Sequence, residues 1–437
     1  MENIKMFLRS VIKAGIFKAL LSIILIGLLS CQGNISQKNS AEETTSRSID
    51  TTMFRHHFIA TDLPGDAKWG YGVSLFADID NDGDPDYVTC VLQDSIYWFE
   101  NNVNVNGEWA RHTVGKILTS QLGSAIMDID GDGWLDVITG TTWYQNPRNP
   151  RESLFKKIVY DSKIGVMHDV VTADVNGDGK TDIVVTGDKD GCFWYEIPGD
   201  PLKESNWNRH LITMDVLVEK DGIHGGFFPA GISDLDGDGD ADIVLPDRWL
   251  ENRNQGKEWI KHPLPFARKR GPWGLSSRSW IVDLDKDGFA DIVMSDCDQK
   301  GSEVAWLEND GQHPPSFKPH FLKQEATGIR GSFHSLAVAD FNGDGNPDIF
   351  VVDQEDPSIL PSGAGPRWFI WKNMGTEEIT FKERVIFDGG LGGHDARVGD
   401  MDGDGDLDII SKIWNRWPEN SNGGREHVDW LENLLIK

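Results

Sequence analysis

Short apolar runs of strand length recur throughout residues 53–437, and polar, turn-forming stretches separate them. The most regular are β-branched runs such as DIVVTG from Asp182 and DIVLP from Asp242. A tryptophan-centred run such as WLEN at Trp249 follows, then a W-x-x-H run such as WIKHPL at Trp259, then a run of small residues such as SLAVAD ending at Asp340. β-branched and aromatic residues favour strands. The pattern therefore predicts an all-β chain with four strands in each repeat.

A nine-residue string, typified by DLDGDGDAD from Asp234, occurs seven times, with starts 46 to 60 residues apart. A period of that length is typical of blade-sized structural repeats. Seven four-stranded repeats predict a seven-bladed β-propeller over residues 53–437. The run FRHHFI from Phe54 precedes the first repeat, and the last repeat ends at WLENLLIK without an outer strand. We expect the N-terminal strand to complete the last blade and close the ring, which removes two open sheet edges.

Each string carries carboxylate or amide oxygens at positions 1, 3, 5 and 9 and glycine at position 6. Hard oxygen ligands on a tight turn suit Ca²⁺, and glycine permits the left-handed backbone that the turn needs. We therefore predict up to seven calcium ions, with weaker binding where asparagine replaces aspartate. The expected ligands are Asp78, Asp80, Asp82 and Asp86; Asp128, Asp130, Asp132 and Asp136; Asp174, Asn176, Asp178 and Asp182; Asp234, Asp236, Asp238 and Asp242; Asp283, Asp285, Asp287 and Asp291; Asp340, Asn342, Asp344 and Asp348; and Asp400, Asp402, Asp404 and Asp408.

Two other structures share features of these loops. An EF-hand shares the opening of the string but needs a bidentate glutamate at position 12 and flanking helices, and no copy has a carboxylate there. Asp-Gly turns can also cap hairpins without metal. The strings, however, contain 29 of the 70 acidic residues, in a chain with a formal net charge of -28. Carboxylates packed so densely repel one another unless cations neutralise them. The same charge argues against nucleic acid as a partner.

The first 31 residues have the features of a bacterial lipoprotein signal. Lys5, Arg9, Lys13 and Lys18 precede an apolar run over residues 19–29 that is too short to span a membrane. A small residue and Cys31 follow, so we expect Cys31 to be lipidated. Polar residues 32–52 would form a tether. The protein would then be a monomeric outer-membrane lipoprotein of the bacterial cell envelope, periplasmic or surface-exposed, held to the membrane by lipid alone.

Candidate ligand-binding residues lie where the chain enters the first strand of each blade, and on long turns between second and third strands. Both would lie on the face opposite the aspartate loops. These insertions are rich in glycine, aromatic residues and arginine, a composition that suits carbohydrate or cell-surface protein ligands. The candidates are His168, His224, Trp273, Arg278, Trp280, Arg330, His334, His394, Arg397 and Trp414.

Histidines that converge at such a mouth suggest two further roles. They could bind an additional divalent metal, or they could transfer protons. For catalysis the candidates are His168 or His394 as the base, Asp395 beside it, and Arg330 or Arg397 to stabilise an oxyanion. By contrast, we interpret the W-x-x-H histidines as satisfied strand residues and the repeat tryptophans as core. Cys90, Cys192 and Cys297 have no paired spacing, and we expect them to be buried and free.

The D-x-D-x-D-G-x-x-D loops followed by a DIV strand resemble the FG-GAP/VCBS repeat proteins, which include the propeller of integrin α-subunits. The resemblance covers nearly all of residues 53–437 and implies a propeller whose loop aspartates, such as Asp234, Asp236, Asp238 and Asp242, are calcium ligands. The W-x-x-H and H-D features are also similar to the propeller half of aldos-2-ulose dehydratase. That second resemblance implies an alternative function, a sugar lyase or dehydratase that works by β-elimination.

Overall fold

The computed structural model describes residues 53–435 except 65–69, 103–107, 118–121, 188, 218–221, 267–270, 272, 361–363, 377 and 421. Residues 49–437 form one compact unit. The expected signal peptide with Cys31, and the tether of residues 32–52, lie outside the described residues. Within the described part of the chain, no helix is long and apolar enough to cross a membrane.

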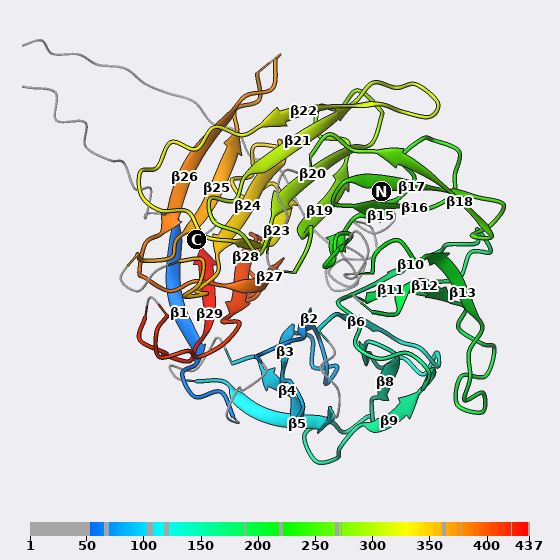
Figure 1. The fold of residues 1–437 in the computed structure, drawn as a ribbon. Helices are drawn as coiled ribbons and strands as arrows, with labels where there is room; N and C mark the ends of the chain where they lie inside the picture. The colour runs from blue at the N-terminus through cyan, green and yellow to red at the C-terminus, as the bar shows by residue number, and fades with distance from the viewer. Residues whose placement is uncertain are drawn as a thin grey trace, which may run out of the picture. The chain divides into compact units, whose positions relative to one another are not determined.

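Seven sheets, each with four antiparallel strands and one with a short additional parallel strand, are arranged around a central axis, which confirms the seven-bladed propeller (Figure 1). Consecutive strands pair within each blade, as the order of apolar runs indicates. Blades one to three comprise β2 (Ser74–Ala77), β3 (Asp86–Val91), β4 (Ser95–Glu100) and β5 (Ala110–Lys116); β6 (Ser124–Met127), β7 (Asp136–Thr139), β8 (Thr142–Gln145) and β9 (Lys156–Val159); and β10 (Asp169–Ala173), β11 (Asp182–Gly187), β12 (Gly191–Tyr195) and β13 (Arg209–Thr213).

The remaining blades follow the same order, from the innermost strand outward. Blades four to seven comprise β15 (Ile232–Ser233), β16 (Asp242–Leu245), β17 (Arg248–Arg253) and β18 (Glu258–Pro263); β19 (Ser277–Val282), β20 (Asp291–Asp296), β21 (Val304–Asn309) and β22 (Phe317–Phe321); β23 (Phe333–Ala339), β24 (Asp348–Asp353), β25 (Trp368–Asn373) and β26 (Phe381–Phe387); and β27 (His394–Gly399), β28 (Asp408–Lys412), β29 (Val428–Asn433) and β1 (Phe54–Ala60).

The N-terminal strand β1 closes the ring by pairing with β29, as the sequence predicts. Its register runs from Phe54 opposite Asn433 to Ala60 opposite Val428. Polar side chains reinforce the pairing: His56 Nε2 lies 2.7 Å from an oxygen of Asp429. Covering the edge of blade seven with β1 satisfies backbone groups that would otherwise be an open sheet edge.

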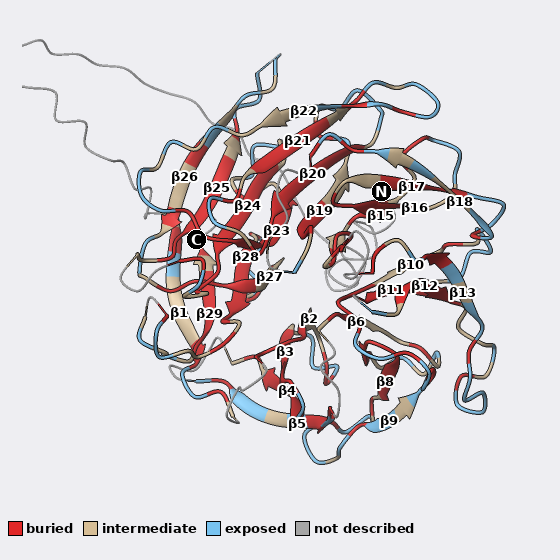
Figure 2. Cartoon of the chain, in the orientation of Figure 1, coloured by how far each residue is buried: buried red, intermediate tan, exposed pale blue. Residues whose placement is uncertain are grey.

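The apolar core lies between neighbouring blades, where buried strands face one another (Figure 2). Trp98 of blade one, for example, packs in the same cluster as Val137 and Tyr144 of blade two. The second strands are buried along their whole length, as in DIVVTG of β11, and this explains their continuous apolar runs. Cys90, Cys192 and Cys297 are buried and free, as expected.

The innermost strand of blade four is divided at Gly231. Residues 229–230 form β14 (Pro229–Ala230), which pairs in parallel with β19 of blade five, and β15 then pairs with β16. A Cβ atom at Gly231 would lie 2.1 Å from the Ser279 hydroxyl, so only glycine fits where the two blades approach. This division brings the segment before β14, with His224 and Phe228, to the centre of the ring.

Candidate functional site

The seven aspartate-rich loops join the first and second strands of the blades and share one backbone geometry. Their position-6 glycines, from Gly83 in blade one to Gly405 in blade seven, all have positive φ, between 82° and 105°. In every loop the N–H of this glycine donates to the position-1 carboxylate, at 2.7 to 3.1 Å. The turn that the sequence predicts therefore forms in all seven copies.

The position-9 aspartates are held by the second strand and by backbone donors. Asp242 accepts hydrogen bonds from the N–H groups of Leu235 at 2.9 Å and Asn252 at 2.8 Å. Burial raises the pKa of Asp242 to about 8. Matching pairs of backbone donors, one on each carboxylate oxygen, hold the aspartates of four other loops, namely Asp86, Asp136, Asp291 and Asp408.

Positions 1, 3 and 9 of a loop converge as a set of hard oxygen donors. The carboxylates of Asp234, Asp236 and Asp242 have oxygens within 4.8 Å of one another, and the loops from Asp78 and Asp128 form equivalent groups. Such an all-oxygen donor set fits calcium. In some loops, arginine or lysine side chains of the protein already neutralise part of the aspartates' negative charge.

Among the described residues, four loops have an arginine or lysine within 4.0 Å of a loop aspartate: Arg148 lies 2.7 Å from Asp132 in blade two and Lys180 lies 4.0 Å from Asp178 in blade three, and the loops of blades one and six have closer or more central cations. Arg151 of blade two inserts its guanidinium between Asp80 at 2.5 Å and Asp82 at 2.7 Å in the blade-one loop. In the blade-six loop, Lys372 lies 3.3 Å from Asp344. Asn342 of that loop directs its amide nitrogen to Asp348, at 2.7 Å.

A cavity of about 860 Å³ lies at the centre of the ring, at the starts of the innermost strands. The aspartate loops follow the other ends of those strands, so the two features belong to opposite ends of the blades. The cavity wall includes His168, His224, His334 and His394, which the sequence places at equivalent repeat positions. The structure thus brings all four histidines into one site.

Aromatic rings line the cavity in two stacks. In the first, Trp273 stacks on His224 at 5.9 Å, and His224 lies 4.0 Å from His168 with the two rings tilted by 57° (distances between ring centroids). In the second, Trp414 lies 4.9 Å from His394, which lies 4.4 Å from His334. Trp273 is 57% exposed, so its ring remains available to a ligand.

Each of three histidines contacts a buried aspartate. His168 Nδ1 lies 2.7 Å from Asp169, His394 Nδ1 lies 2.8 Å from Asp395, and His334 Nε2 lies 2.8 Å from Asp298. Burial lowers the pKa of His168 and lowers that of His394 well below its usual value, against the opposing effect of the adjacent aspartates. Both imidazoles are therefore neutral at pH 7 and can accept a proton.

Arg278 connects these pairs into one network. Its Nη2 donates to Asp395 at 2.8 Å and to His334 Nδ1 at 3.1 Å, and its Nη1 lies 3.9 Å from Asp169. Because a guanidinium only donates, His334 Nδ1 accepts and its proton resides on Nε2, which donates to Asp298. Burial opposes the charge of Arg278, but Asp395 and other neighbours raise its pKa above the ordinary value.

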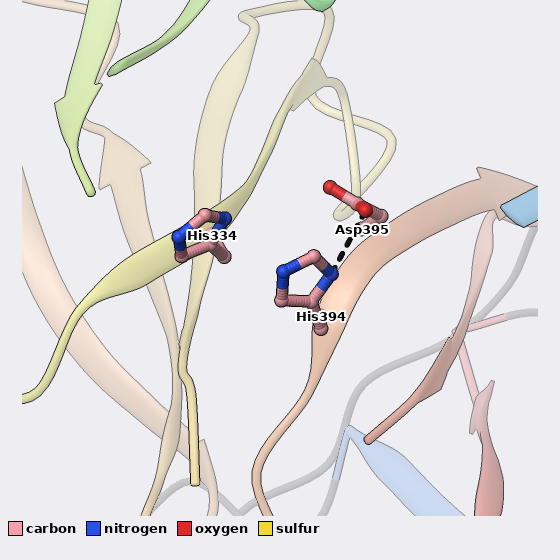
Figure 3. Close-up of side chains that lie close together, drawn as sticks. All are labelled: His334, His394 and Asp395. Atoms are coloured by element: carbon pink, nitrogen blue, oxygen red, sulfur yellow. Dashed lines mark ion pairs between the residues drawn. The ribbon is translucent and has the colours of Figure 1, made fainter. Parts of the chain in front are cut away.

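His334, His394 and Asp395 each offer a ligand atom within 4.8 Å of the others, the grouping expected of a metal site (Figure 3). Figure 3 shows the two rings on neighbouring innermost strands, β23 and β27. Arg278, however, already donates to His334 and Asp395, and Lys412 Nζ lies 3.3 Å from His394 Nδ1. Two cations beside the ligand atoms would repel a divalent ion. The additional metal at the mouth therefore stays a prediction, and the charges around these three residues argue against it.

Three of the expected binding residues are not in the cavity wall. Arg330 pairs with Glu383 at 2.7 Å and stacks on Phe369 in blade six. Trp280 packs in the core between blades. Arg397 is half-buried, its Nε donates to the Ser74 carbonyl and its guanidinium lies over the Phe228 ring. The basic segment of residues 267–270 lies outside the described residues.

Other residues of the site were not predicted individually. Asp298 lies just beyond β20 and reaches His334 of the next blade. Lys412 ends β28 and contacts His394. The aspartate at the turn and the lysine at a strand end carry no repeat signature, because these contacts depend on how adjacent blades pack.

The outer W-x-x-H histidines belong to the blade structure, in agreement with their interpretation as satisfied strand residues. His262 stacks on Trp249 with 4.4 Å between ring centroids and bonds to Glu251 at 2.7 Å. The same stack on the blade's tryptophan and contact with a glutamate occur at His112, His210 and His320.

Repeats, blades and loops together define the class of protein as a propeller built from aspartate-loop repeats. The FG-GAP-like repeat family matches residues 78–139, 234–294, 283–351 and 358–411, which is more than half of the chain. The protein therefore belongs to the FG-GAP-like repeat family. A comparison with curated proteins gave no match.

Several solved structures share the fold at low sequence identity. A structure of BBS1N in complex with ARL6DN is 8% identical with a TM-score of 0.50, covering 87% of this chain and 97% of that one. An Agrocybe aegerita lectin that recognises non-reducing terminal N-acetylglucosamine is 21% identical with a TM-score of 0.48, covering 74% and 81%. YCF48 from Cyanidioschyzon merolae is 10% identical with a TM-score of 0.48, covering 87% and 98%. At these identities the likeness concerns the fold alone.

Proposed function

We propose that the protein is an exported, lipid-anchored propeller that holds calcium in its aspartate loops and binds a carbohydrate in its central cavity. The observation that carries the proposal is the cavity of about 860 Å³, lined by two aromatic stacks and buried polar groups. A recessed cavity of this size suits a small or extended ligand. A protein partner would need a broad exposed surface instead.

Carbohydrate is the ligand class that fits both the aromatic and the polar parts of the cavity wall. Exposed indole faces such as that of Trp273 offer flat apolar area to the C–H face of a sugar. Buried donors and acceptors, held in place by the Arg278 network, offer directional hydrogen bonds to hydroxyl groups. The wall also includes apolar Leu92, Leu122 and Phe228, which exclude water around those bonds.

Calcium in the loops would reinforce the ring from the opposite ends of the blades. The support is the shared turn geometry and the convergent carboxylates, as at Asp234, Asp236 and Asp242. A divalent ion on each cluster relieves repulsion between aspartates that the fold holds together. Lipidation at Cys31 is proposed from the sequence alone, and metabolic labelling with a palmitate analogue in wild type and Cys31→Ala tests it.

The carbohydrate proposal is tested with a glycan array followed by thermal-shift titration of each hit, with and without calcium. The expected result is saturable binding that raises the melting temperature. Trp273→Ala should weaken binding about tenfold or more, because a stacked indole contributes on the order of 1–3 kcal/mol. Exposed Phe289 lies outside the cavity wall, so Phe289→Ala is the matched control. Absence of any saccharide binding would refute the proposal.

A second candidate, elimination beside a sugar carbonyl, is favoured by two pairs in which a neutral histidine contacts a charged aspartate, His168–Asp169 and His394–Asp395. One imidazole would remove the proton beside the carbonyl and return it to the β-oxygen, whose C–O bond breaks as the C=C bond forms, so that the oxygen leaves as water or an alcohol. Arg278 is better placed than Arg330 or Arg397 to stabilise the oxyanion because it lines the cavity. Incubation with keto-sugars or uronates should then produce the absorbance of an unsaturated sugar. His394→Ala should abolish it and His320→Ala should not; no product from any substrate would eliminate this candidate.

A further inference from the structure

Arg278 and Asp298 each leave one buried polar atom without a hydrogen bond in the cavity wall. Arg278 is 2% exposed and Asp298 is 8% exposed, and both line the cavity. Arg278 Nη1 and Asp298 Oδ2 have no hydrogen-bond partner. The Ser276 hydroxyl helps to lower the pKa of Asp298, yet it makes no hydrogen bond of normal geometry either. Leaving such groups unpaired is costly, so they indicate where a ligand bonds.

Arg278 Nη1 needs a hydrogen-bond acceptor, and Asp298 Oδ2 needs a donor. A guanidinium nitrogen only donates, whereas a carboxylate oxygen only accepts. Arg278 and Asp298 also bond to different nitrogens of the same His334 ring, at 3.1 and 2.8 Å, so they lie on opposite sides of it. A ligand that contacts both must carry an acceptor and a donor on separated atoms. Hydroxyl groups spaced around a sugar ring meet this requirement, because each hydroxyl can act in either sense.

The charges around these atoms are already balanced. Arg278, Lys412 and Arg397 all interact with Asp395, and Arg278 interacts with Asp169 as well. Asp298 joins this set through His334, which bonds to both Asp298 and Arg278. Burial lowers the pKa of Lys412 to about 8 and that of Arg397 to about 10, values at which both are mainly charged at pH 7.

The remaining charged groups of the wall are acidic. Asp356 and Glu419 lie on it, and Arg278 is the one described arginine or lysine that lines the cavity. An anionic ligand would meet uncompensated carboxylates, and it would leave Asp298 facing a second acceptor. This differs from the basic mouth that the arginine-rich insertions suggest, because Arg330 pairs with Glu383 and Arg416 pairs with Glu426 instead.

We propose that the cavity selects a neutral sugar, with one hydroxyl accepting from Arg278 and another donating to Asp298. The inference rests on the carbohydrate proposal and specifies the ligand's charge and its two anchoring contacts. A sugar acid of the same ring type would add repulsion between its carboxylate and the acidic groups of the wall, and it would lose the bond to Asp298 where the carboxylate replaces the donating hydroxyl. Aromatic faces at Trp273 and Trp414 would take the apolar side of the same ring or of its neighbour in an oligosaccharide.

The test is calorimetric titration, at pH 7 and low salt, with matched pairs of oligosaccharides that differ in charge: gluco- and glucurono-, galacto- and galacturono-, manno- and mannurono- forms. We expect the neutral member of the bound pair to have a Kd about tenfold or more below that of its acidic counterpart. Asp298→Asn and Arg278→Lys should each raise the neutral sugar's Kd about tenfold or more.

Controls keep the comparison independent of folding. Asp161 is as buried as Asp298 but pairs with Arg209 away from the cavity, so Asp161→Asn is the matched control for Asp298→Asn. Arg330 is buried and pairs with Glu383 outside the cavity wall, so Arg330→Lys is the matched control for Arg278→Lys. Tighter binding of the acidic member, or equal Kd values in Asp298→Asn and Asp161→Asn, would overturn the inference while leaving carbohydrate binding intact. Absence of binding by every pair would instead refute the carbohydrate proposal and this inference with it.

Discussion

Arg278 of blade five donates to Asp395 of blade seven at 2.8 Å, although 117 residues separate them in the chain. Between them, His334 of blade six accepts from the same guanidinium nitrogen. Three consecutive innermost strands are therefore joined at one buried cation. The contact holds the ring together as well as forming the cavity wall.

Removing that cation should destabilise the fold. Arg278→Met leaves Asp395 and Asp169 buried near a neutral side chain, which costs on the order of 3–5 kcal/mol of unfolding free energy. Urea denaturation of wild type and Arg278→Met measures this loss of unfolding free energy. Asp395→Asn should cost less on the Arg278→Met background than in wild type, because the two residues act as a pair. Strict additivity of the two changes would contradict the network.

The closing strand depends on apolar packing as well as hydrogen bonds. Phe54 is 6% exposed and lies 6.5 Å from Phe341, between ring centroids, in the core of the last two blades. Phe54→Ala should lower the unfolding free energy by about 3–5 kcal/mol through lost burial and a cavity. Denaturation with urea checks this, with the exposed Phe289→Ala as the control. A change near zero would show that β1 does not carry ring closure.

His427 gives the protein a stability that depends on pH. It is buried between Asp429 and Glu355, with His56 on the other oxygen of Asp429 and Asn422 beside its ring. Burial alone would lower the pKa of His427, but Asp429 and Glu355 raise it to about 10. The unfolded value is about 6.5.

The sign of the effect follows from that order of pKa values. The folded state holds the proton more tightly, so the stabilisation from His427 is complete below about pH 6.5 and is lost as pH rises toward 10. The difference in unfolding free energy between wild type and His427→Gln should therefore shrink over this window. A difference that stays constant from pH 6.5 to 10 would contradict the assignment.

Calcium binding should differ among the loops. Within the part of the chain that the structure describes, no guanidinium pairs with the aspartates of the blade-four loop as Arg151 pairs with Asp80 and Asp82 in blade one. Titration of chelator-treated protein should show Arg151→Gln binding calcium more tightly at one site than wild type, and Asp234→Asn losing one site. A melting temperature unchanged by chelator would rule out a structural role for calcium.

The blades were predictable because their signal is local and repeated. A string such as that at Asp234 sets a turn, and the apolar run after it sets a buried strand, without reference to distant residues. His168 and His394 were predictable for the same reason: equivalent positions in a closed ring face one axis. Asp298 was not, because its contact with His334 arises from the packing of blade five on blade six. Arg330 was expected at the ligand site, but it does not line the cavity because a buried glutamate of its own blade binds it.

The most direct test of the account is a crystal structure of the protein with the strongest neutral saccharide from the array. We expect sugar density in the central cavity, with hydroxyls bonded to Arg278 and Asp298 and a ring against Trp273 or Trp414. Density on the outer strands or on the aspartate-loop face, with the cavity holding only water, would contradict it.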